Sequence, residues 1–169
     1  MNLRILAVCL LALISSPAGA RLDVGAVPPD ALGKTPGNEE INISQFRGTV
    51  VIVTFWASWC GPCRSELPVL DVLQKSAGDR VRIIAVNVKD SREDYKLIRR
   101  QRKDAAITFT HDTRGTIADG FDVKGCPNLF VIDQTGRISA VHVGFNDESL
   151  ARIVGDINSC WWIRQRPRR

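Results

Sequence analysis

The sequence contains no run of about 20 apolar residues, the length that a helix needs to cross a bilayer, so a polytopic membrane protein is excluded. It also has no excess of charge in its main part. Five of the 23 basic residues lie near the two ends, and residues 21–160 therefore hold 18 basic and 18 acidic side chains. The net charge of +5 belongs to the ends and gives no support to nucleic-acid binding.

The composition lacks the signs of disorder, collagen and coiled coil. Hydrophobic residues make up 44% and charged residues 24%, which is close to an ordinary soluble globular protein. A length of 169 residues accommodates one domain and leaves little room for a second.

Residues 1–20 have the pattern of a secretory signal peptide. Arg4 is their only charge, an apolar stretch follows over residues 5–14, and the segment ends in Ala18-Gly19-Ala20. We expect cleavage after Ala20 and export, with a bacterial periplasm as the simplest destination. Export would place the four remaining cysteines, at positions 60, 63, 126 and 160, in a compartment where disulfides persist.

Beyond residue 20, predicted strands alternate with predicted helices. Strands are expected over residues 49–57, 81–88, 107–111, 129–133 and 137–143, and helices over 63–77, 91–103, 116–121 and 147–158. Residues 21–48 are expected to be irregular, with a short hairpin around residues 33–37. This order predicts one α/β domain over residues 21–160, with a central mixed β-sheet flanked by helices on both faces, and a basic C-terminal tail over 161–169.

The segment Cys60-Gly61-Pro62-Cys63 stands where the first long strand meets its helix, a position typical of a redox-active dithiol. A helix N-terminus carries unpaired N–H groups and partial positive charge. This environment is expected to lower the pKa of the Cys60 thiol below its free value of about 8.5, which makes Cys60 the attacking thiolate. Cys63, one turn further on, is then the resolving thiol, and both are predicted to be catalytic.

Two structural alternatives compete with this interpretation. A zinc site needs further ligands, and the only two histidines, His111 and His142, show no paired spacing. Cys126 and Cys160 are likewise unpaired in the sequence. A purely structural disulfide is disfavoured because so short a loop constrains little unfolded-state entropy. We therefore predict neither a metal nor a cofactor.

Several segments resemble the thioredoxin superfamily. Residues 55–64 are similar to its active site, Pro68 to its helix-kinking proline, and Gly125-Cys126-Pro127 to its cis-proline loop. Residues 24–25, 28–30, 66–68 and 128–136 more narrowly resemble exported thiol–disulfide oxidoreductases of the TlpA/ResA type, and residues 91–121 resemble that family's central insertion. The resemblance covers residues 22–158 and implies a thioredoxin-like fold. It also implies that clients bind at Trp59, Gly61, Pro62, Gly125, Cys126 and Pro127.

Two positions depart from the family pattern. Thr54 stands nearest to the place of a buried acid in cytoplasmic thioredoxin, and a threonine cannot ionise. Proton transfer at Cys63 then has to use water or a different group, or proceed more slowly. Cys126 replaces the usual apolar, β-branched or threonine residue before the proline. It is open whether Cys126 is an inert packed thiol, a partner of Cys160, or a modulator of the dithiol.

The leading hypothesis is a protein-disulfide reductase that exchanges the Cys60–Cys63 pair with exported protein clients. The family typically supplies electrons for cytochrome c maturation or copper-site assembly, and such a reductant is itself re-reduced by a membrane-bound electron donor. A Cu(I)-binding chaperone that uses Cys60, Cys63 and Cys126 is one alternative. A thiol peroxidase is another, disfavoured because Ala57 stands where such an enzyme has Thr or Ser.

Two basic segments remain. The first is interpreted as a solvated helix face without a nucleic-acid partner, and it comprises Arg99, Arg100, Arg102 and Lys103. The second is the tail over residues 161–169, in which Trp161 and Trp162 precede four arginines. We interpret the tail as a mobile solvating extension, or alternatively as a weak contact with an anionic membrane surface.

Overall fold

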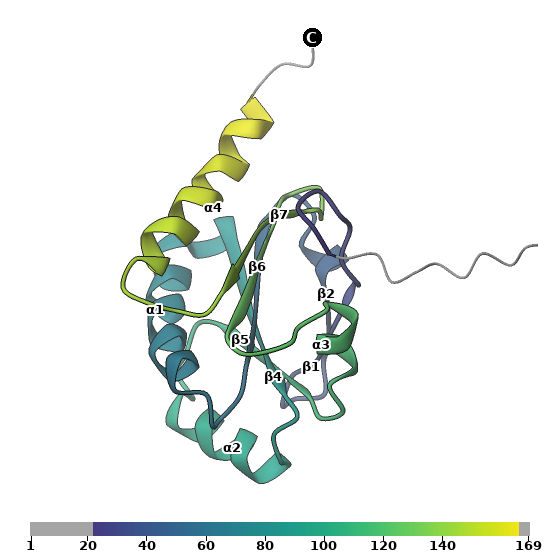
Figure 1. Ribbon diagram of the computed structural model, residues 1–169, viewed down its shortest axis with the longest axis vertical. Helices are drawn as coiled ribbons and strands as arrows, with labels where there is room; N and C mark the ends of the chain where they lie inside the picture. The colour runs from purple at the N-terminus through teal and green to yellow at the C-terminus, as the bar shows by residue number, and fades with distance from the viewer. Residues whose placement is uncertain (1–21, 166–169) are drawn as a thin grey trace, which may run out of the picture.

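The computed structural model describes residues 22–165 (Figure 1). The strands are β1 (Ala31–Lys34), β2 (Glu40–Asn42), β3 (Val50–Trp56), β4 (Val81–Val88), β5 (Thr108–Asp112), β6 (Asn128–Ile132) and β7 (Ile138–Val143). The helices are α1 (Gly61–Ala77), α2 (Arg92–Gln101), α3 (Thr116–Gly120) and α4 (Ser149–Gln165), with short 3-10 helices η1 (Ile43–Phe46) and η2 (Gly78–Arg80). The predicted signal peptide and the last four residues of the predicted tail lie outside the described residues.

The strands form one mixed sheet in the order β2-β1-β5-β4-β3-β6-β7. β3, β4 and β5 run parallel, joined by helical crossovers, and the other neighbouring strands pair antiparallel. The carboxyl ends of the three parallel strands therefore meet at one edge of the sheet, where α/β folds gather their functional residues. The prediction of a central mixed sheet is confirmed.

Helices cover both faces of this sheet, as predicted. α1, α2 and α4 pack on one face through residues such as Leu70, Tyr95 and Ile153. α3 and η1 pack on the other face, through Ala118 and Ile43. Figure 1 shows α1 and α4 together on one side and α3 on the opposite side. All seven residues of β3 are buried, because this central strand has both of its faces covered.

The segment before β3 is more ordered than the sequence predicted. The hairpin expected around residues 33–37 forms between β1 and β2, and the Thr35 N–H donates to the Glu39 carbonyl oxygen at 2.9 Å across its turn. β1 also pairs with β5 through Lys34 and His111, so the hairpin extends the sheet. Strands of three and four residues are too short to show the alternating pattern by which strands are recognised in a sequence.

The last helix is longer than the sequence predicted, since α4 continues to Gln165 and not to about residue 158. Ile153, Ile157, Cys160 and Trp161 recur at helical spacing and pack against the core face of α1 and the sheet. The structure therefore corrects the expectation that the tail begins at Trp161, because that residue still belongs to α4. No helix in the described range 22–165 is long and apolar enough to span a bilayer.

Candidate active site

The predicted dithiol lies at the carboxyl end of β3, where the chain enters α1. Cys60 is the N-cap of α1, and its sulfur accepts a hydrogen bond from the Cys63 N–H at 3.2 Å. The two sulfurs form a disulfide of 2.02 Å, with Cα atoms 5.3 Å apart. Both cysteines are buried. The unpaired N–H groups at this helix end favour negative charge on Cys60 once the disulfide is reduced.

Exposed residues surround the buried Cys60 sulfur. Gly61 and Pro62 occupy the first turn of α1, where proline costs no backbone hydrogen bond. Both are exposed, and the Trp59 side chain is 72% exposed although it is large and apolar. An exposed indole next to a reactive pair suits contact with a partner surface. These three residues lie where the sequence placed client contacts.

The second predicted client loop, Gly125-Cys126-Pro127, reaches the same edge of the sheet. β6 follows this loop directly and pairs with β3, with Asn128 opposite Phe55. The Cys126–Pro127 peptide bond is cis, as the resemblance implied. Gly125 is exposed and Pro127 is buried. The two segments predicted to contact clients are therefore brought together, although 60 or more residues separate them in the sequence.

Cys126 is a free, half-buried thiol that packs against both core clusters. Burial raises its pKa to about 11, and the negative charges of Asp90 and Glu66 add to the shift. Cys126 is therefore protonated at neutral pH. Cys160 is a free, buried thiol on α4, so the possible Cys126–Cys160 disulfide is not present in this structure.

Glu66 is the first functional candidate that the sequence analysis did not identify. It lies three residues after Cys63, on the inward face of α1, and is only 1% exposed. The Thr54 hydroxyl donates a hydrogen bond to Glu66 Oε2 at 2.7 Å. Burial raises the pKa of Glu66 to about 7, and the hydrogen bond from Thr54 partly opposes the shift. Thr54 cannot ionise, but its hydrogen bond holds a glutamate of the adjacent helix. The dithiol therefore has an ionisable neighbour.

Asp90 is the second residue that the sequence analysis missed. It follows β4 and is buried, and its carboxylate accepts hydrogen bonds from the Ser58 N–H at 2.7 Å and from Asn87 Nδ2 at 2.6 Å. The Ser58 hydroxyl donates a further bond at 3.1 Å. Ser58 is two residues before Cys60, so Asp90 fixes the loop that carries the dithiol. The position of Asp90 after a buried strand was the available signal.

Aromatic rings pack around Trp56, the residue from which the chain enters the same loop. The fully buried Trp56 ends β3, four residues before Cys60. Its ring meets Phe109 edge-on at 5.7 Å between centroids and lies 6.4 Å from Tyr95. Within the part of the chain that the structure describes, no group of three or more His, Cys, Asp or Glu side chains could hold a metal ion.

Comparison with known proteins gives consistent results. The family model described as Redoxin matches residues 23–157. The chain is 34% identical over 122 residues to the thioredoxin-like protein YneN of Bacillus subtilis (strain 168), covering 71% of each chain. It is 31% identical over 141 residues to the thiol:disulfide interchange protein DsbE homolog of Paracoccus denitrificans (strain Pd 1222), covering 78% of this chain and 76% of that protein.

A solved structure agrees with these sequence matches. The fold superposes with a TM-score of 0.76 on a crystal structure assigned as the thiol:disulfide interchange protein DsbE of Chlorobium tepidum. Identity is 31%, and the match covers 82% of this chain and 98% of that one. The predicted resemblance to the thioredoxin superfamily, and within it to oxidoreductases of the TlpA/ResA type, is confirmed.

Proposed function

Because this chain belongs to the Redoxin family and is a thiol–disulfide oxidoreductase, we propose that its Cys60–Cys63 pair reduces disulfides in exported protein clients. The observation that carries this proposal is the disulfide at the N-terminus of α1, next to the exposed Trp59 and the cis-proline loop. Cys60 is the attacking residue and Cys63 the resolving one. Trp59, Gly61, Pro62, Gly125, Cys126 and Pro127 form the client-binding surface.

Reduction of a client proceeds in two exchanges. The Cys60 thiolate attacks one sulfur of the client disulfide, that bond breaks, and the other client sulfur leaves as a thiolate and takes up a proton. Cys63 then loses its proton and attacks the Cys60 sulfur. The mixed disulfide breaks, and the second client sulfur leaves and is protonated in turn. The client gains two electrons from the dithiol and two protons, one that Cys63 releases and one from the solvent, and the protein ends with its Cys60–Cys63 disulfide.

Glu66 is the group that accepts the Cys63 proton in this scheme. A carboxyl group with a pKa of about 7 can take up and release protons near neutral pH, as efficient general acid–base catalysis requires. Its place one helical turn after Cys63 puts it on the same face of α1. The Thr54 hydroxyl holds Glu66 Oε2 and so orients the carboxyl group.

The buried carboxylates also support a reducing direction. Negative charge in a buried site raises the free energy of a nearby thiolate and so favours the disulfide form. After burial, which is the largest cause, Glu66 and Asp90 both add to the raised pKa of Cys126 in the neighbouring cis-proline loop, and we infer that their charges disfavour a thiolate at the dithiol as well. A protein whose dithiol form is destabilised in this way donates electrons readily.

The setting we propose is outside the cytoplasm, in a periplasm, after cleavage of residues 1–20. A membrane-bound electron donor would then reduce the protein again after each turnover. Cytochrome c maturation and copper-site assembly are the two client classes that fit such a reductant.

A redox titration of the full mature protein against glutathione tests the proposal. Midpoints are about −270 mV for the reductant thioredoxin and about −120 mV for the oxidant DsbA. We expect the Cys60–Cys63 pair to fall below about −220 mV, closer to thioredoxin than to DsbA. A midpoint close to that of DsbA would contradict the reducing direction, and a failure of Cys60 to form mixed disulfides would contradict the chemistry.

A further inference from the structure

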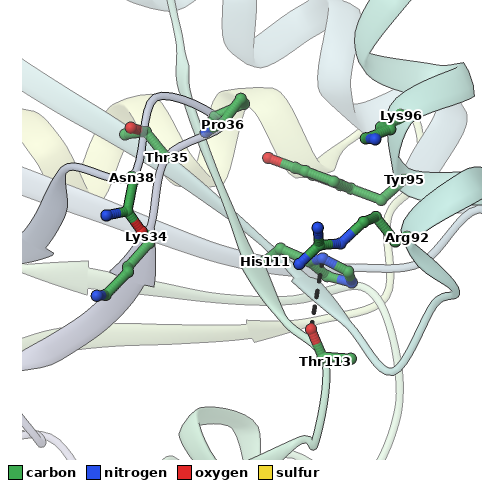
Figure 2. Close-up of a pocket in the computed structure, with 9 residues that line it drawn as sticks. All are labelled: Lys34, Thr35, Pro36, Asn38, Arg92, Tyr95, Lys96, His111 and Thr113. Carbon is green, nitrogen blue, oxygen red and sulfur yellow. Dashed lines mark hydrogen bonds between the residues drawn. The ribbon is translucent and has the colours of Figure 1, made fainter.

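A hollow of about 400 Å³ lies between the tip of the β1–β2 hairpin, α2 and the end of β5 (Figure 2). A second hollow of about 350 Å³ shares Pro36, Tyr95 and Lys96 with the first and continues along α2 to Lys103. The two hollows form one groove beside the helix. We call it the α2 groove.

Three of the cations that line the α2 groove have no partner among the described residues. Arg92, Lys96 and Arg100 follow one another at four-residue spacing, which places them on one face of α2. Among the described residues, none of the three has an ion pair or a side-chain hydrogen bond. Lys34 differs, because Glu40 lies 3.3 Å from its ammonium group. The unpaired positive charges argued here therefore all lie on α2.

Tyr95 adds an independent sign of a missing partner. Its side chain is 5% exposed, and its hydroxyl has no hydrogen-bond partner in the described structure. Its ring stacks on His111 at 4.5 Å, and Figure 2 shows the hydroxyl directed toward the hairpin tip at Thr35 and Pro36. Burial raises the pKa of Tyr95 to about 12, so the hydroxyl is a donor that lacks an acceptor. A buried donor left unpaired is unfavourable, and an oxygen of a bound ligand would satisfy it.

We propose that the α2 groove binds an acidic segment of a polypeptide, with carboxylates on Arg92, Lys96 and Arg100 and one carboxylate oxygen on the Tyr95 hydroxyl. The length of the groove favours a polypeptide over a small anion. Arg92 and Arg100 are eight residues apart on a helix, which is about 12 Å along its axis. One small anion cannot span that length, whereas an extended chain of about four residues can. Pro36 supplies an apolar contact at the centre.

The groove is connected to the dithiol through two sets of contacts. Tyr95 lies against Trp56, which leads into the Cys60 loop. The His111 Nε2–H donates to the backbone carbonyl oxygen of Asp90 at 3.0 Å, and the Asp90 carboxylate holds Ser58. An acidic segment in the groove would thus lie at the same edge of the sheet as the dithiol. We identify this acidic segment as part of a redox client, and that identification rests on the proposed function. The binding of an acidic segment to the groove does not.

Fluorescence anisotropy with a labelled, cysteine-free peptide rich in Glu and Asp tests the proposal on the full mature protein in its disulfide form. A peptide with Gln and Asn in place of the acids is the neutral control. The double variant R92Q/K96Q should bind the acidic peptide about tenfold more weakly, because two charge pairs are lost. The variant K75Q/R80Q removes the same charge at the C-terminal end of α1 and in the adjoining η2, and it should bind like the wild type.

Tyr95→Phe keeps the buried ring and should weaken acidic-peptide binding about threefold to tenfold through the lost hydrogen bond. Wild-type affinity in both Y95F and R92Q/K96Q would overturn the proposal. Competition by inorganic phosphate or citrate at the concentration of the peptide would also overturn it, in favour of a small-anion site. Neither the peptide nor the oxidised protein has a free reactive dithiol, so this result is independent of whether Cys60 reduces clients.

Discussion

Two thiols stand at the same edge of the sheet, and the structure gives them opposite chemical surroundings. Cys60 caps α1, where backbone N–H groups converge and the Cys63 N–H donates to its sulfur. Cys126 precedes the cis-proline, where burial and the carboxylates of Asp90 and Glu66 raise its pKa to about 11. The same functional group is therefore expected to react in one place and to remain protonated in the other.

This difference shows that neither exposure nor the presence of a cysteine decides which sulfur reacts. Cys60 is less exposed than Cys126 in the disulfide form. What separates the two is the local environment. The positive end of a helix favours a thiolate at Cys60, whereas desolvation by burial, and to a lesser degree the charges of Asp90 and Glu66, disfavour one at Cys126. Changes to either environment should alter the contrast between the two thiols.

The largest effect is expected from the dithiol itself. Cys60→Ser removes the attacking sulfur and should abolish the reduction of insulin disulfides. Cys63→Ser leaves the attack intact and removes the resolving thiol, so clients should accumulate as mixed disulfides on Cys60. Non-reducing gels followed by peptide mapping measure both outcomes. Mixed disulfides on Cys126 in the C63S variant would contradict the assignment.

The next largest effect is expected from Glu66→Gln, which removes the proposed acceptor of the Cys63 proton. Stopped-flow measurement of mixed-disulfide resolution should show a loss of about 100-fold at pH 8, the typical contribution of a general base. In the wild type the rate should rise with pH through about 7, as Glu66 loses its proton. Thr54→Val removes the hydrogen bond that lowers this pKa and should move the midpoint upward. An unchanged pH profile in E66Q would remove Glu66 from the mechanism.

Glu66 also links the site to the stability of the fold. Its pKa rises from 4.5 to about 7 on folding, so the native state holds a proton that the unfolded chain releases within that window. The free energy of unfolding should therefore fall as pH rises from about 4.5 to 7 and then level off. Chemical denaturation at pH 8 should show Glu66→Gln to be more stable than the wild type by about 3 kcal/mol, with little difference at pH 4. Equal pH dependence in the two proteins would contradict a buried acid.

A smaller effect is expected from Asp90→Ala, which removes the acceptor for the Ser58 N–H and for Asn87. Loss of these buried hydrogen bonds should destabilise the fold by about 1–3 kcal/mol in chemical denaturation. The removal of a negative charge should also shift the glutathione midpoint of the dithiol to a less negative value. Asp90→Asn keeps an acceptor oxygen and loses the charge, so it separates the two effects. A midpoint that is unchanged in both variants would show that Asp90 acts only on the loop.

The smallest effect is expected from Cys126→Val, which fills a similar volume without a thiol. We expect insulin reduction to be retained and the redox midpoint to shift, because Cys126 lies at the active-site edge without taking part in exchange. A complete loss of activity would make Cys126 a catalytic residue. Wild-type potential and unchanged Cu(I) affinity would leave it as a packing residue.

Features with a strong local signal were predicted from the sequence. The buried strand β3 is a continuous β-branched and aromatic run, and the Cys60–Cys63 motif directly follows it. The turn between the two strands expected over residues 129–133 and 137–143 is also local, since Asp133 Oδ1 accepts bonds from the Thr135 and Arg137 N–H groups. Such features depend on residues that are neighbours along the chain.

Features that depend on distant residues were missed. The pairing of Thr54 with Glu66 joins a strand to a helix, and Asp90 reaches Ser58 from 32 residues away. Glu66 does not differ in sequence from a solvated surface acid, and Asp90 differs only by its position after a buried strand, so packing is what distinguishes them. The end of α4 was misplaced for a similar reason, because the helix is held beyond residue 158 by the packing of Cys160 and Trp161 on the core.

The central claim is that Cys60 is the reactive thiol and Cys126 is not. Alkylation of the fully reduced protein by iodoacetamide, followed residue by residue with mass spectrometry between pH 5 and pH 11, tests it most directly. We predict that Cys60 reacts fastest at pH 7, with a midpoint below the free-thiol value of about 8.5. Cys126 should gain reactivity only as the pH approaches its pKa of about 11. Faster alkylation of Cys63 or Cys126 than of Cys60 at pH 7 would contradict the account.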